Sequence, residues 1–405
     1  MKSLLLFTVL LFLLFSGCKK SSEWAQWRGP NGDGISKEEN WSADKLDSSN
    51  ILWTKNIGFG HSAISVKGNR CYLSGWKEEI SGIDTIPQTT LYCFDVSSGN
   101  EVWKFSYPSA RRSYPGPRST PVLDENNLYV LSWEGKLFCL DAKTGKEKWT
   151  NDLIKDSLAV IDQWGCCPSP VIYEDLILLN LNKSGIALNK NNGKVVWNSA
   201  REEAHYASAQ LVTYKNKKVA VFMSGPIVYL VEPSNGDIVT QFNKTSEKGM
   251  ENDVIQTSSG MIFTSNELLE PTDSGLKSVW LNDTVSSLFR TGVVIGDYAY
   301  QLADNKNKTS VNCVDLKNGI PVWSASQSGY GSLIAVNDKL IVLTGLGEVI
   351  IADATPVKFI LRKRLQVFSP ENKSPNWCWT APSFLDGKLF IRNSGGEMAC
   401  INLES

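Results

Sequence analysis

The stretch LFCLDAKTGKEKWTN, residues 137–151, contains the features that decide the fold. An alternating apolar run ends at Asp141, and a short turn containing Gly145 follows it. A glycine supplies the positive φ angle that such a hairpin turn requires. The chain then continues into a second run that carries Trp149. This order of residues predicts a β-hairpin with one aromatic side chain on its second strand.

The same hairpin pattern recurs along the chain. Clear copies occupy 91–105, 185–199 and 311–325, weaker copies occupy 228–242 and 268–282, and a degenerate copy occupies 349–365. Upstream of each hairpin lies another pair of short apolar runs split by a polar turn, as in PVLDENNLYVLSW. Each unit therefore predicts four short strands, repeated about every 40–50 residues, which is typical of the blades of a β-propeller.

The number of units predicts an all-β, eight-bladed β-propeller of four-stranded antiparallel blades. The residues that end the units are Trp53, Trp103, Trp149, Trp197, Thr240 or Phe242, Trp280, Trp323 and a poor match near Leu361. The last unit, which ends in MACINLES, supplies only three strands. We therefore expect residues 50–57 to pair beside 397–403 and close the ring, which removes exposed sheet edges. Seven blades are the alternative, if 349–365 does not form a blade.

The N-terminal residues predict a targeting segment. The apolar run at 4–15 is too short to span a bilayer but has the length of a signal-peptide core. Cys18 follows two small residues, an arrangement that resembles a bacterial lipobox, in which the cysteine is lipidated. An ordinary signal peptide with an incidental cysteine is the alternative. The expected divisions are a signal peptide at 1–17, a lipidated tether and lead-in segment at 18–49, and a single propeller at 50–405.

The composition excludes several classes of function. The net charge of −1 provides no basic field for nucleic acid. The chain has only two histidines, His61 and His205, which argues against a histidine-built metal site, and we predict no metal ligands. The fourteen tryptophans are explained if one aromatic side chain per unit packs between neighbouring sheets. A row of rings that stacks on a sugar or cofactor is the alternative.

The repeated hairpins, with Leu140-Asp141, Thr144-Gly145 and Trp149 at fixed spacing, resemble the repeats of the pyrroloquinoline-quinone (PQQ)-like propeller superfamily. The opening EWAQWRGPNGDGIS, residues 23–36, resembles the start of a bacterial subgroup described only as PQQ-binding-like propeller proteins. The superfamily contains quinoprotein alcohol and sugar dehydrogenases, and also the BamB-type lipoprotein, a non-enzymatic scaffold of outer-membrane protein assembly. Fold alone does not choose between them.

Adjacent cysteines at Cys166-Cys167 bear on that choice. In the alcohol-oxidising quinoproteins, the resemblance implies that such a pair forms a strained disulfide over one face of the quinone. The same enzymes need a calcium ion held by oxygen ligands and an Asp as general base. Glu251 and Asp253 are the nearest acidic candidates and lie two predicted blades away. PQQ with calcium is therefore the alternative expectation, and we assign no catalytic residue.

The cysteine pair occupies a position that recurs just before the first strand of each blade. In a propeller this stretch surrounds the central channel on the face that carries the blade-to-blade connections. The residues at these positions are His61, Arg118, Cys166, Cys167, Tyr206, Glu251, Arg290, Tyr330 and Trp379. They are chemically mixed, whereas the blades are repetitive, and this contrast predicts a binding funnel. Ordinary drift of loop sequence is the alternative.

These observations predict a non-catalytic propeller that binds a protein or glycan partner, in the manner of a scaffold and with a resemblance to BamB. We expect it to be lipid-anchored in the bacterial envelope, at the outer membrane and facing the periplasm. A periplasmic PQQ-dependent alcohol or sugar dehydrogenase is the alternative.

Overall fold

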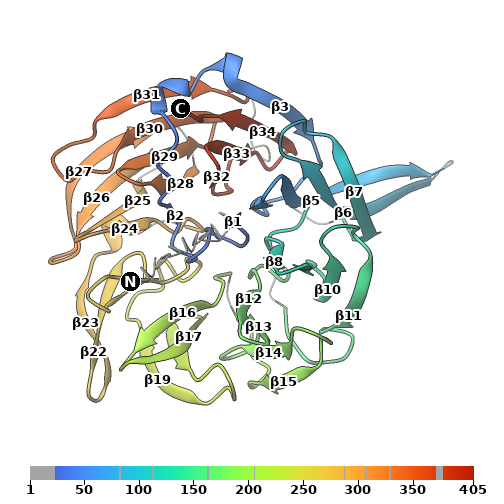
Figure 1. Cartoon of the computed structure of the whole chain (residues 1–405). Helices are drawn as coiled ribbons and strands as arrows, with labels where there is room; N and C mark the ends of the chain where they lie inside the picture. The colour runs from blue at the N-terminus through green and yellow to red at the C-terminus, as the bar shows by residue number, and fades with distance from the viewer. Residues whose placement is uncertain are drawn as a thin grey trace, which may run out of the picture.

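Eight β-sheets are arranged as a ring around a central channel (Figure 1). This computed structural model describes residues 23–81, 84–111, 114–161, 164–204, 206–286, 288–305, 308–327, 330–370 and 377–405. The predicted eight-bladed propeller is confirmed, and the seven-bladed alternative is wrong because the degenerate unit at 349–365 forms part of a complete blade. Within the described residues the helical content is limited to three 3-10 turns, η1 (Ala43–Lys45), η2 (Ser48–Asn50) and η3 (Asp283–Val285).

The two inner strands of each blade are short and mostly buried, except where the second strand extends beyond the ring. The innermost strands are β4 (Ser65–Lys67), β8 (Val122–Asp124), β12 (Val171–Tyr173), β16 (Gln210–Tyr214), β20 (Ile255–Gln256), β24 (Val293–Ile295), β28 (Gly331–Val336) and β32 (Ser383–Leu385). The second strands are β5 (Arg70–Ser81), β9 (Asn127–Leu131), β13 (Leu176–Leu179), β17 (Lys217–Ser224), β21 (Ile262–Phe263), β25 (Tyr298–Asn305), β29 (Lys339–Thr344) and β33 (Lys388–Arg392).

The two outer strands of each blade are the repeated hairpin of the sequence. The third strands are β6 (Asp84–Asp95), β10 (Lys136–Asp141), β14 (Ile186–Asn189), β18 (Ile227–Val231), β22 (Glu267–Thr272), β26 (Lys308–Asp315), β30 (Glu348–Asp353) and β34 (Glu397–Asn402). The outermost strands are β7 (Glu101–Pro108), β11 (Glu147–Asp152), β15 (Val195–Asn198), β19 (Ile238–Asn243), β23 (Gly275–Leu281), β27 (Ile320–Gln327), β31 (Leu361–Gln366) and β3 (Ile51–Asn56).

The ring is closed as predicted, by an N-terminal strand in the last blade. Strand β3 pairs antiparallel with β34, and Trp53 lies opposite Cys400. The last sheet therefore has the order β3-β34-β33-β32, with its outermost strand drawn from the start of the propeller. This pairing satisfies an edge that would otherwise be open.

Six of the eight outermost strands carry a tryptophan, and its indole packs on the turn of the next blade, whereas β19 and β31 have none. A Cβ atom at Gly145 would lie 2.5 Å from the ring of Trp103, and one at Gly99 would lie 2.5 Å from the ring of Trp53. The indole N–H of Trp103 also donates to the carbonyl of Ala142 at 3.1 Å. The turn glycine is thus required for its positive φ, 71° at Gly145, and for the close approach of the neighbouring indole. The expected packing between sheets is observed.

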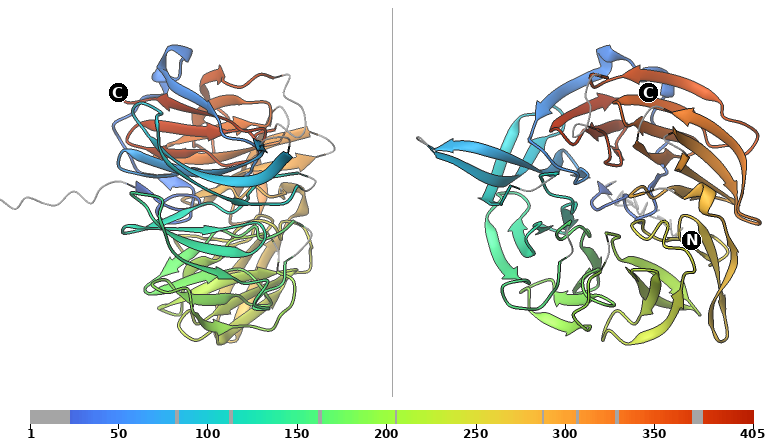
Figure 2. Two further views of the ribbon diagram at one scale, coloured as in Figure 1. Left: turned by 90° about the vertical axis from the view of Figure 1, so that its right-hand side faces the viewer. Right: turned by 180° about the vertical axis from the view of Figure 1, so that it is seen from behind.

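Two further strands come from the lead-in segment. Strand β1 (Glu23–Trp24) pairs antiparallel with β4 of the first blade, and β2 (Ile35–Ser36) pairs parallel with β28 of the seventh. The segment between them therefore crosses one end of the channel (Figures 1 and 2). In the same views the hairpin of β5 and β6 projects beyond the ring. No helix long and apolar enough to cross a bilayer occurs in the described part of the chain.

Candidate functional site

All eight interblade connections contribute to one central cavity. Its volume is about 300 Å³. Each connection runs from the outermost strand of one blade to the innermost strand of the next, so its end lies beside the channel. The lining residues are Trp27, His61, Tyr114, Arg118, Trp164, Cys167, Ser169, Tyr206, Ser208, Glu251, Asp253, Phe289, Thr291, Tyr330, Trp377, Trp379 and Thr380. Sixteen of these belong to the connections, and Trp27 belongs to the lead-in segment.

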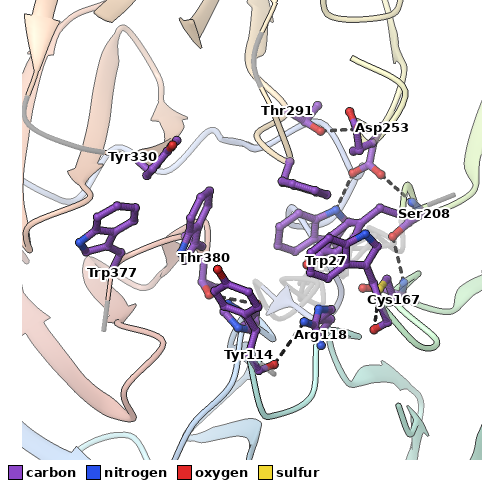
Figure 3. Close-up of a pocket in the computed structure, with 17 residues that line it drawn as sticks. Trp27, Tyr114, Arg118, Cys167, Ser208, Asp253, Thr291, Tyr330, Trp377 and Thr380 are labelled. Atoms are coloured by element: carbon purple, nitrogen blue, oxygen red, sulfur yellow. Dashed lines mark hydrogen bonds between the residues drawn. The ribbon is translucent and has the colours of Figure 1, made fainter. Parts of the chain in front are cut away.

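Trp27 forms the floor of the cavity. Its indole Nε1 donates to Oδ2 of Asp253 at 2.5 Å, as Figure 3 shows, and the lead-in ribbon passes behind the pocket in that view. The neighbouring Arg28 is buried and fixes the segment in place. Its guanidinium donates to the carbonyls of Thr291 at 2.7 Å and Asp33 at 2.8 Å, and also to that of Gly292. The channel is thus closed behind the pocket by a segment bonded to the sixth blade.

A chain of hydrogen bonds links the first six blades at the neck of the cavity. It uses the position two residues before each innermost strand, where a backbone N–H donates to the side-chain oxygen of the equivalent residue in the next blade. The bonds are Ala63 N to Thr120 Oγ1, Thr120 N to Ser169 Oγ, Ser169 N to Ser208 Oγ, Ser208 N to Asp253 Oδ1, and Asp253 N to Thr291 Oγ1. Their lengths lie between 2.7 and 3.0 Å. This chain fixes the spacing of the connections.

Asp253 is the one carboxylate in that chain, where its neighbours have hydroxyl groups. It accepts from Ser208 N at 2.7 Å with one oxygen and from Trp27 with the other. Burial raises the pKa of Asp253, and this effect is opposed by the nearby Arg28 guanidinium. Since both oxygens already accept a hydrogen bond, the carboxylate anchors the floor of the pocket.

Half-buried aromatic rings form the walls. On one side, the ring of Tyr330 stacks on that of Trp379 with centroids 4.4 Å apart, and Trp377 lies 4.8 Å from Tyr330 (Figure 3). In a second group, Tyr206 and Phe289 meet edge to face with ring centroids 4.7 Å apart, and Trp164 meets Phe289 edge to face at 6.3 Å. Rings held against one another keep their orientation, so the walls are formed before any ligand arrives.

An arginine lies against each aromatic group. The guanidinium carbon of Arg118 is 4.8 Å from the ring centroid of Trp133 and 5.9 Å from that of Trp164. The guanidinium of Arg290 lies 5.3 Å from the ring of Tyr330. Arg118 also donates to the carbonyl of Tyr114 at 3.2 Å. The positive charge at the pocket is therefore located against the rings.

The remaining titratable groups differ in their surroundings. Burial, with Arg118 and Arg392 nearby, holds the pKa of His61 well below its usual range, so this imidazole is neutral at pH 7. One carboxylate oxygen of Glu251 is buried and has no hydrogen-bond partner among the described residues. Behind it, Lys244 donates to Oδ1 of Asn266 at 3.0 Å, and burial lowers the pKa of Lys244 to about 8.

The structure brings together most of the residues that the sequence singled out. Seven of the nine line the cavity: His61, Arg118, Cys167, Tyr206, Glu251, Tyr330 and Trp379. Cys166 instead packs in the apolar core around β9, β10, β13 and β14, and Arg290 lies behind Tyr330. Cys18, the predicted lipidation site, lies outside the described residues, as does His205.

Sequence reasoning missed the floor and several wall residues, including Trp27, Trp164, Phe289 and Trp377. The hydroxyl chain had a detectable pattern, because Thr120, Ser169 and Ser208 occupy the same register before their strands. Trp27 had no such pattern, since its partner Asp253 is 226 positions away in the sequence.

The residues present do not fit PQQ with calcium. Calcium prefers six to eight oxygen ligands, but the described residues that line the cavity include two carboxylates, and Asp253 is already engaged with Trp27 and Ser208. Within the described residues no group of three His, Cys, Asp or Glu side chains could hold a metal ion. Cys167 has a thiol that donates to the carbonyls of Trp164 and Gly165 at 3.5 Å, and the structure shows no disulfide with Cys166.

Similarity to known proteins extends over most of the chain. It is 20% identical over 339 residues to the outer membrane protein assembly factor BamB of Shewanella oneidensis, covering 76% of this chain and 79% of that protein. A quinoprotein ethanol dehydrogenase of Pseudomonas aeruginosa is 31% identical over 141 residues, which are 33% of this chain. That match spans only 21% of the dehydrogenase.

Solved structures share the fold at low sequence identity. BamB of Moraxella catarrhalis has a TM-score of 0.59 at 11% identity, covering 87% of this chain and 99% of that one. A quinohemoprotein alcohol dehydrogenase of Pseudomonas putida has a TM-score of 0.63 at 10% identity, covering 95% of this chain and 80% of that one. The family model described as outer membrane protein assembly factor BamB matches residues 87–355. The chain therefore belongs to that family of PQQ-like β-propellers.

Proposed function

We propose that this chain is a non-catalytic binding module of the bacterial cell envelope, and that its central pocket holds part of a protein or glycan partner. The observation that carries the proposal is the convergence of all eight connections on one aromatic cavity with Trp27 as its floor. Loops of varied sequence held at one place by a rigid scaffold are typical of binding sites.

The chemistry of the pocket favours binding over catalysis. Its walls are aromatic, its histidine is neutral, and one of its two carboxylates is used to hold Trp27. Recognition needs apolar faces with a few oriented polar groups, and the cavity offers this combination.

The proposed location follows from the sequence and the relatives. BamB proteins are named for the assembly of outer-membrane proteins, and the chain shares their fold and family. The apolar run at 4–15 followed by Cys18 predicts lipidation. We propose that the mature chain is anchored through Cys18 at the outer membrane and faces the periplasm, where it acts as a scaffold.

Retention of envelope components on the immobilised full-length protein tests the binding role. We expect Trp379→Ala and Tyr206→Ala to abolish retention of the partner while Tm falls by only a few degrees, because both side chains are half-buried at the cavity. Tyr173→Ala is the matched control, since Tyr173 is half-buried on β12 and outside the cavity. Equal retention by all three variants would contradict a role for the pocket.

A PQQ-dependent dehydrogenase is the second candidate, favoured by the 31% identity to a quinoprotein ethanol dehydrogenase over 141 residues. Its test is dye-linked oxidation of alcohols and sugars after incubation with PQQ and calcium. We expect no oxidation above the protein-free blank. Oxidation that disappears in the double variant Cys166→Ser/Cys167→Ser would overturn the non-catalytic role.

A further inference from the structure

The aromatic walls of the pocket are only partly covered by protein. Tyr330, Trp377 and Trp379 form one group, and Tyr206 and Phe289 belong to the other, and all five rings are half-buried. Large aromatic side chains are normally covered in a folded protein or used at a binding surface. Rings left half-covered inside a cavity indicate a ligand with a flat apolar face.

The charges around the rings argue against a cationic ligand. Arg118 lies against Trp164, and Arg290 lies against Tyr330. A cation is attracted to the negative face of an aromatic ring, and a guanidinium already uses that attraction in both groups. A second positive charge in the same cavity would be repelled by both arginines.

The carboxylates argue against an anionic ligand. Glu251 and Asp253 both line the cavity, so an anion bound there would face two acidic groups. Among the charged residues that line the cavity, Arg118 faces these two carboxylates, and the cations Arg28, Lys244 and Arg290 lie just outside it, so both signs of charge surround the ligand. The cavity therefore suits a neutral ligand better than a charged one.

Among the described residues that line the cavity, one buried carboxylate oxygen has no hydrogen-bond partner. The buried Oε2 of Glu251 accepts no hydrogen bond from the described residues. A buried acceptor without a donor destabilises the folded protein, and a ligand hydroxyl that donates to the Glu251 carboxylate would offset this cost. A carboxylate accepts several hydrogen bonds and so suits a ligand with neighbouring hydroxyl groups.

We infer that the pocket binds a neutral pyranose residue of a glycan, with its apolar face against the aromatic walls and its hydroxyl groups donating to Glu251. A sugar ring combines one flat C–H face with a rim of hydroxyl groups, and these match the rings and the unpartnered carboxylate oxygen. The cavity volume of about 300 Å³ suits one ring with part of a second. This inference rests on the proposed binding role and names the class of its ligand.

An array of immobilised neutral, acidic and amino oligosaccharides, probed with the full-length protein, tests the inference. We expect at least one neutral saccharide to bind, and its acidic and amino analogues to bind at least tenfold more weakly. Glu251→Gln keeps the size of the side chain and should weaken binding of the neutral saccharide at least tenfold. Glu247→Gln is the matched control, because Glu247 lies on the same connection, is exposed and does not line the cavity.

Three outcomes would overturn the inference: no neutral saccharide binds, an acidic analogue binds best, or both Gln variants bind like the wild type. The retention experiment with Trp379→Ala separates this failure from failure of the binding role. If that variant loses its envelope partner while no saccharide binds, the partner is a protein and only the saccharide inference is wrong. If it keeps its partner as well, both proposals are wrong.

Discussion

The blades and the interblade connections use tryptophan in opposite ways. In the blades, Trp53 and Trp103 are each pressed against a glycine of the neighbouring turn and donate to a backbone carbonyl. At the pocket, Trp377 and Trp379 are half-buried against other rings, with part of their surface facing the cavity. Tryptophan therefore packs between blades where the sequence repeats, and it presents part of its ring to the cavity where the sequence varies. Position in the repeat thus separates structural from candidate binding residues.

The largest expected effect comes from removing a blade tryptophan. Trp53→Ala should lower the free energy of unfolding by about 3–5 kcal/mol, because it empties a buried site and removes the hydrogen bond to the Val96 carbonyl. Trp379→Ala should cost only about 0.5–1.5 kcal/mol, the value of an aromatic pair, since the ring mainly stacks on Tyr330. Urea denaturation of both variants measures the difference. Similar losses would mean that the pocket tryptophan is as structural as the blade tryptophan.

The fold was predictable because the blade pattern repeats. The hairpin of 137–151 recurs with its glycine and tryptophan in register, so each copy supports the assignment of the others. Closure through 50–57 was predictable for a related reason, since the last unit lacked one strand and an unpaired one was available. The wall positions Tyr206, Tyr330 and Trp379 followed from the same register, whereas Trp164, Phe289 and Trp377 did not.

The floor was not predictable from the sequence. Trp27 meets Asp253 across 226 positions, and Arg28 donates to the carbonyls of Thr291 and Gly292 through contacts that leave no local pattern. The lead-in segment is outside the repeat, so no copy of it exists for comparison. A long-range contact that occurs once in the chain forms only when the ring is assembled, so the sequence alone does not reveal it.

Charged side chains are buried in both regions, among them Lys244 in a connection and Arg392 in a blade, and Lys244 tests the cost of such burial through pH. Burial lowers the pKa of Lys244 from 10.5 to about 8. Between these values the unfolded chain binds a proton that the folded chain does not, so stability should rise with pH across this window. The gain of the wild type relative to Lys244→Met should approach about 3 kcal/mol between pH 8 and 10.5. Parallel pH profiles of the two proteins would show that Lys244 stays charged when buried.

A smaller effect is expected at the floor of the pocket. An amide has one acceptor oxygen, so Asp253→Asn leaves either Trp27 or the Ser208 N–H without its acceptor, at a cost of about 1–2 kcal/mol. Hydrogen exchange of residues 23–36 should become faster, because the amide has one oxygen for both Trp27 and Ser208 and, being neutral, no longer attracts Arg28. Asp33→Asn is the control, since its oxygen can still accept from Ile35 N. Unchanged exchange in Asp253→Asn would mean that Arg28 alone holds the floor.

The smallest effect concerns the cysteines. Thiols in the blades and thiols in the connections should react equally slowly with an alkylating agent. Burial raises the pKa of Cys139 to about 11 in a blade and that of Cys378 to about 12 in a connection, so neither forms much thiolate at pH 8. Alkylation of the native protein at pH 8 should therefore label none of the cysteines in the described part of the chain, and alkylation after denaturation without reductant should label all eight. A count of six, with Cys166 and Cys167 protected until reduction, would show that the connection carries a vicinal disulfide. That result would also favour the dehydrogenase over the binding role, because so strained a bridge between adjacent residues needs a functional reason to persist.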